Sequence, residues 1–147
     1  MRNSRIQISS SKFQVPSSKC RTTAWVLHEG AEAPLEKPYD LEERTALFGE
    51  SVVRFAKKIS RSPGNNRLID RVVGAGTSLG ANYAEASETV SPKDFKYAIS
   101  RCVKEAKETC FFLRMIAAAE PQLADEARQL YRECRELHLI FASMYRK

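Results

Sequence analysis

The sequence predicts an all-α protein, an up-down-up-down antiparallel four-helix bundle that spans residues 39–147. Apolar residues recur at spacings of three and four along four long segments, which places them on one face of each predicted helix. Turn residues separate the segments, and such short connections favour antiparallel neighbours. No stretch shows a strand pattern of convincing length.

The first helix is predicted to begin at Asp40, because an aspartate N-cap is followed three residues later by Glu43 as its capping-box partner. It is expected to end before the turn sequence Ser-Pro-Gly-Asn-Asn at 62–66. Its predicted core face consists of Leu41, Phe48, Val52, Phe55 and Ile59.

The second helix is predicted to begin near Asn66 and contains Gly74, Gly76 and Gly80. A glycine inside a helix costs about 1 kcal/mol relative to alanine. We therefore expect another helix to approach closely at these glycines. The predicted core face consists of Leu68, Val72, Ala75, Leu79, Asn82 and Ala86.

The third helix has the strongest predicted start, with Ser91 as the cap, Pro92 at the first helical position and Asp94 in the first turn. Its core face is predicted to be Phe95, Ile99, Cys102, Ala106, Cys110, Leu113 and Ala117. Pro121 is predicted to begin the fourth helix. That helix repeats apolar residues as in the seam of antiparallel helices, namely Leu123, Ala127, Leu130, Cys134, Leu137, Phe141 and Met144.

Composition separates the bundle from residues 1–38, which we predict to be a disordered, basic, Ser-rich tail. The tail has six basic and three acidic residues and the bundle eighteen and fifteen, so each carries a formal charge of +3. No apolar run approaches the roughly 18 residues of a membrane span, so we expect a protein without a membrane partner. Four cysteines without a Cys-x-x-Cys pair fit a reducing, cytoplasmic location.

The sequence offers no recognisable active site. Its histidines are His28 and His138, and Glu-x-x-His motifs, which build di-metal sites in helical bundles, are absent. Cys134 and His138 lie four residues apart but supply only two of the ligands that a metal needs. The glycines lie within a helix and not in a phosphate-binding loop. We therefore predict a protein that is not an enzyme and holds no metal or cofactor.

Two interpretations apply to the polar residues of the second and third helices. In the first, a buried polar cluster that could bind a ligand is formed by Asn82, Glu85, Glu105 and Glu108. Alternatively, Asn82 fixes the helix register, while Glu85, Glu105 and Glu108 pair with basic residues of neighbouring helices or subunits. We favour the second interpretation.

Basic residues gather on the third helix, opposite its apolar face. Tyr97 and Phe111 lie in the same sector of about 140°. Basic groups neutralise phosphates, and aromatic rings stack on unpaired bases. A solvated face or a subunit contact would show a similar pattern, and Glu108 interrupts the positive charge. We define the basic stripe as Lys93, Lys96, Arg101, Lys104, Lys107 and Arg114.

Several segments, taken in order, resemble one family. Residues 76–86 read GTSLGANYAEA, followed by SPKDF at 91–95 and KEAKET at 104–109, and residues 39–45 read YDLEERT. This combination is similar to the four-helix bundle proteins first noticed as reading frames within intervening sequences of bacterial 23S ribosomal RNA genes. The resemblance covers about residues 39–146, whereas residues 1–38 depart from the family.

The resemblance implies a bacterial, cytosolic homopentamer with a ring shape and no established enzymatic activity. The accessory variability proteins of diversity-generating retroelements look like the same bundle, and they are basic pentamers that bind nucleic acid and a reverse transcriptase. By this more distant analogy, a reverse transcriptase is a further candidate partner.

Two functional hypotheses follow. The first is a non-catalytic homo-oligomeric bundle that binds RNA or DNA through the basic stripe, with Lys93, Lys104, Lys107 and Arg114 as its main contacts. Repetition around an oligomer would strengthen an individually weak site. The alternative is a protein–protein interaction scaffold without nucleic-acid binding, in which the glycine-rich second helix and the Tyr97 and Phe111 surface contact subunits or partners.

Overall fold

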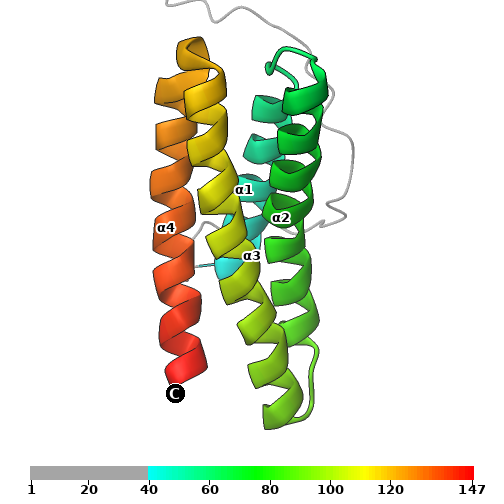
Figure 1. The fold of residues 1–147 in the computed structure, drawn as a ribbon. Helices are drawn as coiled ribbons and strands as arrows, with labels where there is room; N and C mark the ends of the chain where they lie inside the picture. The colour runs from blue at the N-terminus through cyan, green and yellow to red at the C-terminus, as the bar shows by residue number, and fades with distance from the viewer. Residues whose placement is uncertain (1–39) are drawn as a thin grey trace, which may run out of the picture. The chain divides into compact units, whose positions relative to one another are not determined.

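The computed structural model describes residues 40–147, which contain four α-helices and no strand (Figure 1). Helix α1 spans Leu41–Ala56, α2 spans Pro63–Ser87, α3 spans Pro92–Ala119 and α4 spans Ala124–Arg146. A 3-10 turn, Pro121–Leu123, precedes α4. The predicted four-helix arrangement is therefore present, whereas the expectation for residues 1–38 lies outside the described residues.

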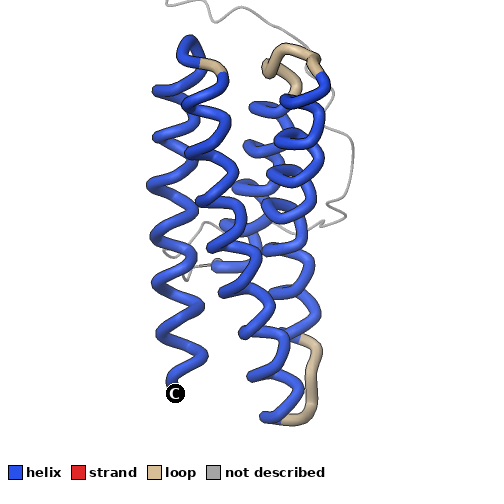
Figure 2. The backbone as a smooth tube through the Cα atoms, viewed as in Figure 1, coloured by secondary structure: helices blue, strands red, loops and turns tan. Residues whose placement is uncertain are grey.

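The three connections lie at the two ends of the bundle. Figure 2 shows the α1–α2 loop and the α3–α4 connection at one end, and the α2–α3 loop at the other. Helix α2 packs against both α1 and α3, and α3 packs against α4. Ion pairs add contacts between α1 and α4, where Arg44 binds Glu133 at 2.6 Å and Lys58 binds Glu126 at 2.8 Å.

The helix starts follow from capping residues. The Asp40 side chain accepts a hydrogen bond from the Glu43 backbone N–H at 3.0 Å, which confirms the predicted cap. Pro92 occupies the predicted first turn of α3, but the Ser91 side chain makes no capping hydrogen bond. Ser91 contributes there through its extended backbone alone.

Three predicted boundaries need correction. Helix α2 begins at Pro63 and not near Asn66, because Ser62 caps it by accepting from the Asn65 N–H at 3.1 Å and proline suits the first helical turn. Helix α1 already ends at Ala56, so Ile59 joins the core from the connection. Pro121 begins a 3-10 turn, and the regular helix starts at Ala124.

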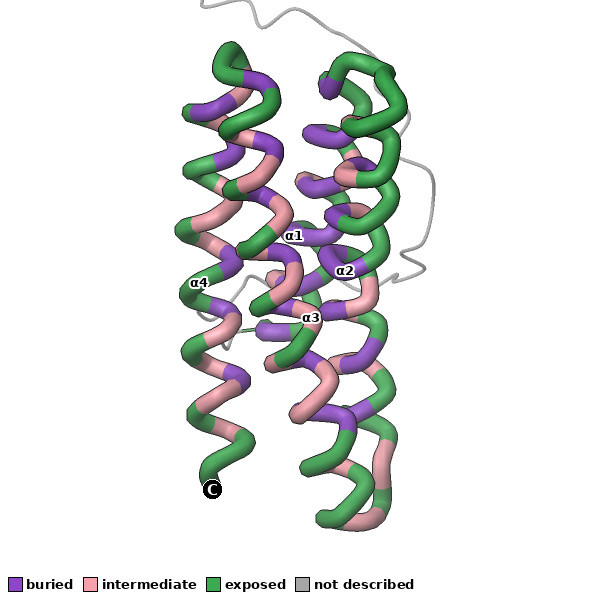
Figure 3. Tube along the Cα trace, in the orientation of Figure 1, coloured by how far each residue is buried: buried purple, intermediate pink, exposed green. Residues whose placement is uncertain are grey.

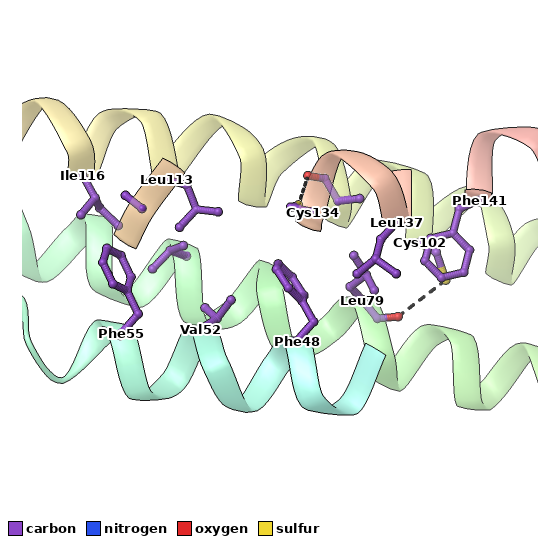
Figure 4. Packing of buried hydrophobic residues seen from close by; sticks show 14 of the residues in the cluster. Phe48, Val52, Phe55, Leu79, Cys102, Leu113, Ile116, Cys134, Leu137 and Phe141 are labelled. Atoms are coloured by element: carbon purple, nitrogen blue, oxygen red, sulfur yellow. Dashed lines mark hydrogen bonds between the residues drawn. The ribbon is translucent and has the colours of Figure 1, made fainter. Parts of the chain in front are cut away.

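Buried residues form a stripe along each helix that faces the bundle interior (Figure 3). Phe48, Val52 and Phe55 of α1 meet Leu79, Leu113, Ile116 and Leu137 of the other helices, as Figure 4 shows. All five core residues predicted for the first helix are buried, including Ile59 in the connection. Seven predicted core residues of the other helices are only partly buried, namely Leu68, Phe95, Cys110, Ala117, Leu123, Leu130 and Met144.

The glycines of α2 bring it close to α1, as predicted. A Cβ added to Gly76 would lie 2.9 Å from Val52 Cγ1, and one added to Gly80 would lie 3.4 Å from the Thr45 carbonyl oxygen. A Cβ on Gly74, in contrast, would meet nothing within 4 Å. Close packing within the bundle therefore explains Gly76 and Gly80 but not Gly74.

Glu120 ties together the two connections at one end of the bundle. It is buried and accepts hydrogen bonds from Ser60 at 3.2 Å and from the side-chain amides of Asn65 and Gln122. The capping segment of α2 is thus anchored to the junction between α3 and α4. None of the helices within 40–147 has the length and apolarity to cross a bilayer.

Candidate nucleic-acid interface

The basic stripe lies on α3 and is accessible to solvent over the length of the helix. Five of its six members are exposed, and Arg101 is partly buried. The two aromatic residues of the same sector are also exposed, Tyr97 by 66% and Phe111 by 54%. Near the carboxyl end of α4, the Lys96 ammonium lies 5.4 Å from the centre of the Tyr145 ring, which is a cation–π distance.

The flank of α3 that faces α2 is electrically compensated. Arg101 binds Glu85 of α2 at 3.2 Å, and Glu108 binds Arg71 of α2 at 2.7 Å. The Arg71 guanidinium also lies 5.4 Å from the centre of the Phe112 ring. Basic and acidic groups alternate here, so this flank attracts a polyanion only weakly.

The flank of α3 that faces α4 has a different charge distribution. Basic and aromatic side chains line a cavity of about 250 Å³ there. No carboxylate lines this cavity. Arg114 and Tyr131 also border a neighbouring hollow of about 350 Å³, which extends the concave surface toward Arg128. We define the α3–α4 groove by the residues that line the first cavity, namely Lys107, Cys110, Phe111, Arg114, Tyr131, Arg135 and His138.

The acidic residues of α4 are engaged away from the groove. Glu133 and Glu136 both bind Arg44 of α1, each with a closest approach of 2.6 Å. Asp125 pairs with Arg128 at 2.7 Å. Because the carboxylates nearest in sequence to Arg135 are held by α1, its charge adds to that of α3.

The titration of groove residues reflects this positive surrounding. The pKa of His138 is lowered, first by burial and then by the charges of Lys107 and Arg135, so the imidazole is neutral at pH 7. The pKa of Cys110 is also lowered, chiefly by a hydrogen bond with the Cys134 side chain and further by Arg135, although burial opposes the shift. Both groups thus experience the charge of Arg135.

The structure therefore divides the predicted stripe. Lys107 and Arg114 join the α3–α4 groove, Lys104 is exposed, Arg101 belongs to the compensated flank, and Lys93 and Lys96 lie near the start of α3. Sequence reasoning missed the contribution of α4. The signal was the spacing of three, four and three between Arg128, Tyr131, Arg135 and His138, which places them on one side of a helix.

The predicted polar pair of α2 does not form a buried cluster. Asn82 is buried, and its Nδ2 has no hydrogen-bond partner within residues 40–147. Glu85 is exposed instead, and its carboxylate pairs with Arg101 of α3 at 3.2 Å. Glu105 is partly buried, and its pKa is raised by burial and by the nearby charge of Glu108.

Within residues 40–147, no group of three or more His, Cys, Asp or Glu side chains gathers in a way that could hold a metal ion. The Cys134 thiol is buried and donates a hydrogen bond to the Ala106 carbonyl oxygen at 3.2 Å. It therefore faces α3, while His138 lines the groove one turn later.

Another, larger cavity of about 540 Å³ lies between α1 and α2. Small side chains and glycine account for most of its lining, and Glu50 and Arg54 at its edge pair with each other at 2.9 Å. We define the α1–α2 groove by its lining residues Glu42, Thr45, Ala46, Gly49, Glu50, Val53, Arg54, Thr77, Gly80, Ala81 and Ala84.

Comparison with known proteins supports the fold. No family model matches the chain, and no curated protein matches it either. A similar solved structure is a protein of unknown function from the S23 ribosomal protein family of Bacteroides thetaiotaomicron. The two share 20% sequence identity with a TM-score of 0.66, over 74% of this chain and all of the other. At this identity the similarity establishes a shared fold.

Proposed function

We propose that this protein is a non-catalytic, homo-oligomeric helical bundle that binds RNA or DNA through the basic stripe of α3. The observation that carries this proposal is the uncompensated positive charge on the α4-facing flank, where Lys107 and Arg114 lie beside an exposed Phe111. Phosphate neutralisation by such groups provides affinity that is independent of base sequence.

The assembly and the family relationship belong to the same proposal. We infer a cytoplasmic pentamer of the 23S rRNA intervening-sequence family, in which each chain follows an up-down-up-down path. The alternation of the connections between the two ends of the bundle supports this path. Five copies of a modestly charged bundle would combine their fields and bind one polyanion with avidity.

The proposal is tested by reversing the charge of two exposed residues in the double variant Lys104→Glu/Lys107→Glu. Both side chains point to solvent, so the bundle should stay folded while binding of structured RNA, single-stranded RNA and duplex DNA weakens at least tenfold. Fluorescence anisotropy over a salt series measures affinity, and light scattering reports the number of subunits. The matched control is Lys57→Glu/Arg61→Glu, which makes the same charge change at exposed positions outside α3.

Retained affinity in the Lys104→Glu/Lys107→Glu variant would show that the basic stripe is the wrong surface. An equal loss in the control variant would show that net charge alone drives the binding. If the wild-type oligomer binds none of the three nucleic acids at physiological salt, the proposed function is wrong.

The alternative function is a protein-interaction scaffold, and the α1–α2 groove favours it. Its small, mostly apolar lining suits the packing of a helix from another chain. A pull-down from nuclease-treated native lysate distinguishes the two functions. A protein partner that still co-purifies stoichiometrically after nuclease treatment would favour the scaffold. Loss of the partner after nuclease treatment would indicate that nucleic acid connects the two proteins.

A further inference from the structure

The α3–α4 groove brings together side chains from two helices. Lys107 of α3 and Arg135 of α4, which both line it, are 28 positions apart in the sequence. Lys107 and Arg114 of α3 and Arg135 of α4 place three positive charges around it, and its lining contains no carboxylate. The charge of the groove therefore favours an anionic ligand.

The spacing of the cations favours a repeated anion. Lys107 and Arg114 are seven residues apart, about 10 Å along a helix, and Arg135 approaches from α4. A chain of phosphates matches such a row of charges better than a single phosphate does. The cavity of about 250 Å³ also falls below the roughly 300–1,000 Å³ of typical small-molecule sites, so it suits one segment of a longer ligand.

Phe111 adds a stacking surface to these charges. Its ring forms a T-shaped pair with Phe112, with ring centres 5.2 Å apart and an interplanar angle of 86°. Phe112 is partly buried, and Arg71 lies against its ring, so Phe112 supports Phe111 from within the bundle. Phe111 itself stays 54% exposed at the groove. An ordered, solvent-facing ring between cations is the arrangement that captures an unpaired base.

We infer that the α3–α4 groove binds single-stranded RNA or DNA, with an unpaired base stacked on Phe111 and phosphates held by Lys107, Arg114 and Arg135. This inference rests on the nucleic-acid binding proposed above and adds both the strandedness of the ligand and the role of α4. Bases in a duplex are stacked on each other and cannot reach a ring within a groove, so duplex binds only through its phosphates.

The first test uses matched apolar and basic variants of the full-length oligomer with a fluorescein-labelled oligothymidylate. Phe111→Ala should weaken binding about five- to hundredfold, as for the loss of one stacked base. As the control, Leu139→Ala removes an exposed apolar side chain of α4 outside the groove and should leave affinity unchanged. Arg135→Gln should reduce the slope of log affinity against log salt by about 0.7, whereas Arg67→Gln on α2 should not.

A spectroscopic variant reports stacking directly and does not depend on the stability of Phe111→Ala. The only tryptophan of the chain is Trp25, so Phe111→Trp in a Trp25→Phe background places a single fluorophore in the groove. Oligothymidylate should quench this fluorescence at saturation while binding with near wild-type affinity. Duplex DNA of the same length should bind more weakly and leave the fluorescence unchanged.

The outcomes separate the two proposals. If nucleic acid binds and Lys104→Glu/Lys107→Glu abolishes binding, but Phe111→Ala and Arg135→Gln have no effect, the groove assignment is overturned and the proposed function stands. Equal affinity for duplex and single strand, or equally strong binding of polyglutamate, would also overturn the groove assignment. Absence of all nucleic-acid binding would overturn both.

Discussion

At the scale of single residues, the three cysteines of the described region all lie on predicted apolar helix faces, but their thiols differ in pKa. Burial raises the pKa of Cys102 to about 12. The hydrogen bond with Cys110, followed by burial, raises the pKa of Cys134 as well, whereas the pKa of Cys110 is lowered. Because the thiolate is the nucleophile, the reactive thiol of the bundle is the one at the α3–α4 groove.

We therefore predict that, in the native protein near neutral pH, iodoacetamide modifies Cys110 before it modifies Cys102 or Cys134. A pKa near 12 instead of 9.0 leaves Cys102 with about a thousandfold less thiolate than an ordinary cysteine, so it should react only after unfolding. Peptide mapping over a time course measures each site and separates it from Cys20. Modification of Cys102 or Cys134 as fast as that of Cys110 would contradict the prediction, and full reactivity of all three in denaturant is the control.

At the scale of the helical elements, the contact between α1 and α2 depends on missing side chains. Gly76 packs directly on Val52, which is completely buried. The Val52 side chain therefore has no free space to move into if a methyl group is added at Gly76. Gly74 lies two residues earlier on the same helix and faces open space. These two glycines allow close packing and helix propensity to be measured separately.

Gly76→Ala should destabilise the bundle by about 1–3 kcal/mol, because the added methyl group overpacks the α1–α2 contact. Gly74→Ala should stabilise it by about 0.5–1 kcal/mol through helix propensity alone. Urea unfolding followed by circular dichroism, at several protein concentrations, measures both changes. A stabilising Gly76→Ala would refute the packing argument. A destabilising Gly74→Ala would indicate that another subunit packs at that glycine.

At the scale of the whole molecule, one bundle presents two surfaces that suit different partners. The α3–α4 groove is basic, whereas the α1–α2 groove is lined mainly by small, apolar groups. If subunits meet at the α1–α2 groove, an oligomer leaves the basic surfaces free to act together. The two proposed properties then do not compete for the same face.

Ala81→Arg places a long, charged side chain at an exposed position of the α1–α2 groove. We predict that this variant stays folded but no longer forms the oligomer. The small residues of the groove would let a helix of another subunit approach closely, and an arginine side chain would block that approach. Light scattering of the purified variant measures its mass, with Ala118→Arg at an exposed position near the end of α3 as the control. An unchanged mass would place the subunit contact elsewhere.

The sequence by itself determined the four helices, most of their buried faces, the cap at Asp40 and the start of α3 at Pro92, because these features depend on residues a few positions apart. It also anticipated the close approach at Gly76 and Gly80, since glycines inside a helix need compensation from packing. The start of α2 at Pro63 was missed because a proline and a glycine in succession also read as a turn.

Only the tertiary structure decided which flanks of the helices meet. The six basic residues of α3 look equivalent in sequence, yet Arg101 is paired with Glu85 while Lys107 and Arg114 join Arg135 of α4. Helical periodicity places a residue on one face of its own helix, but the rotation and axial position of each helix against its neighbours are set by the packing of the whole core. The candidate site lies between two helices, so it became visible only once that packing was known.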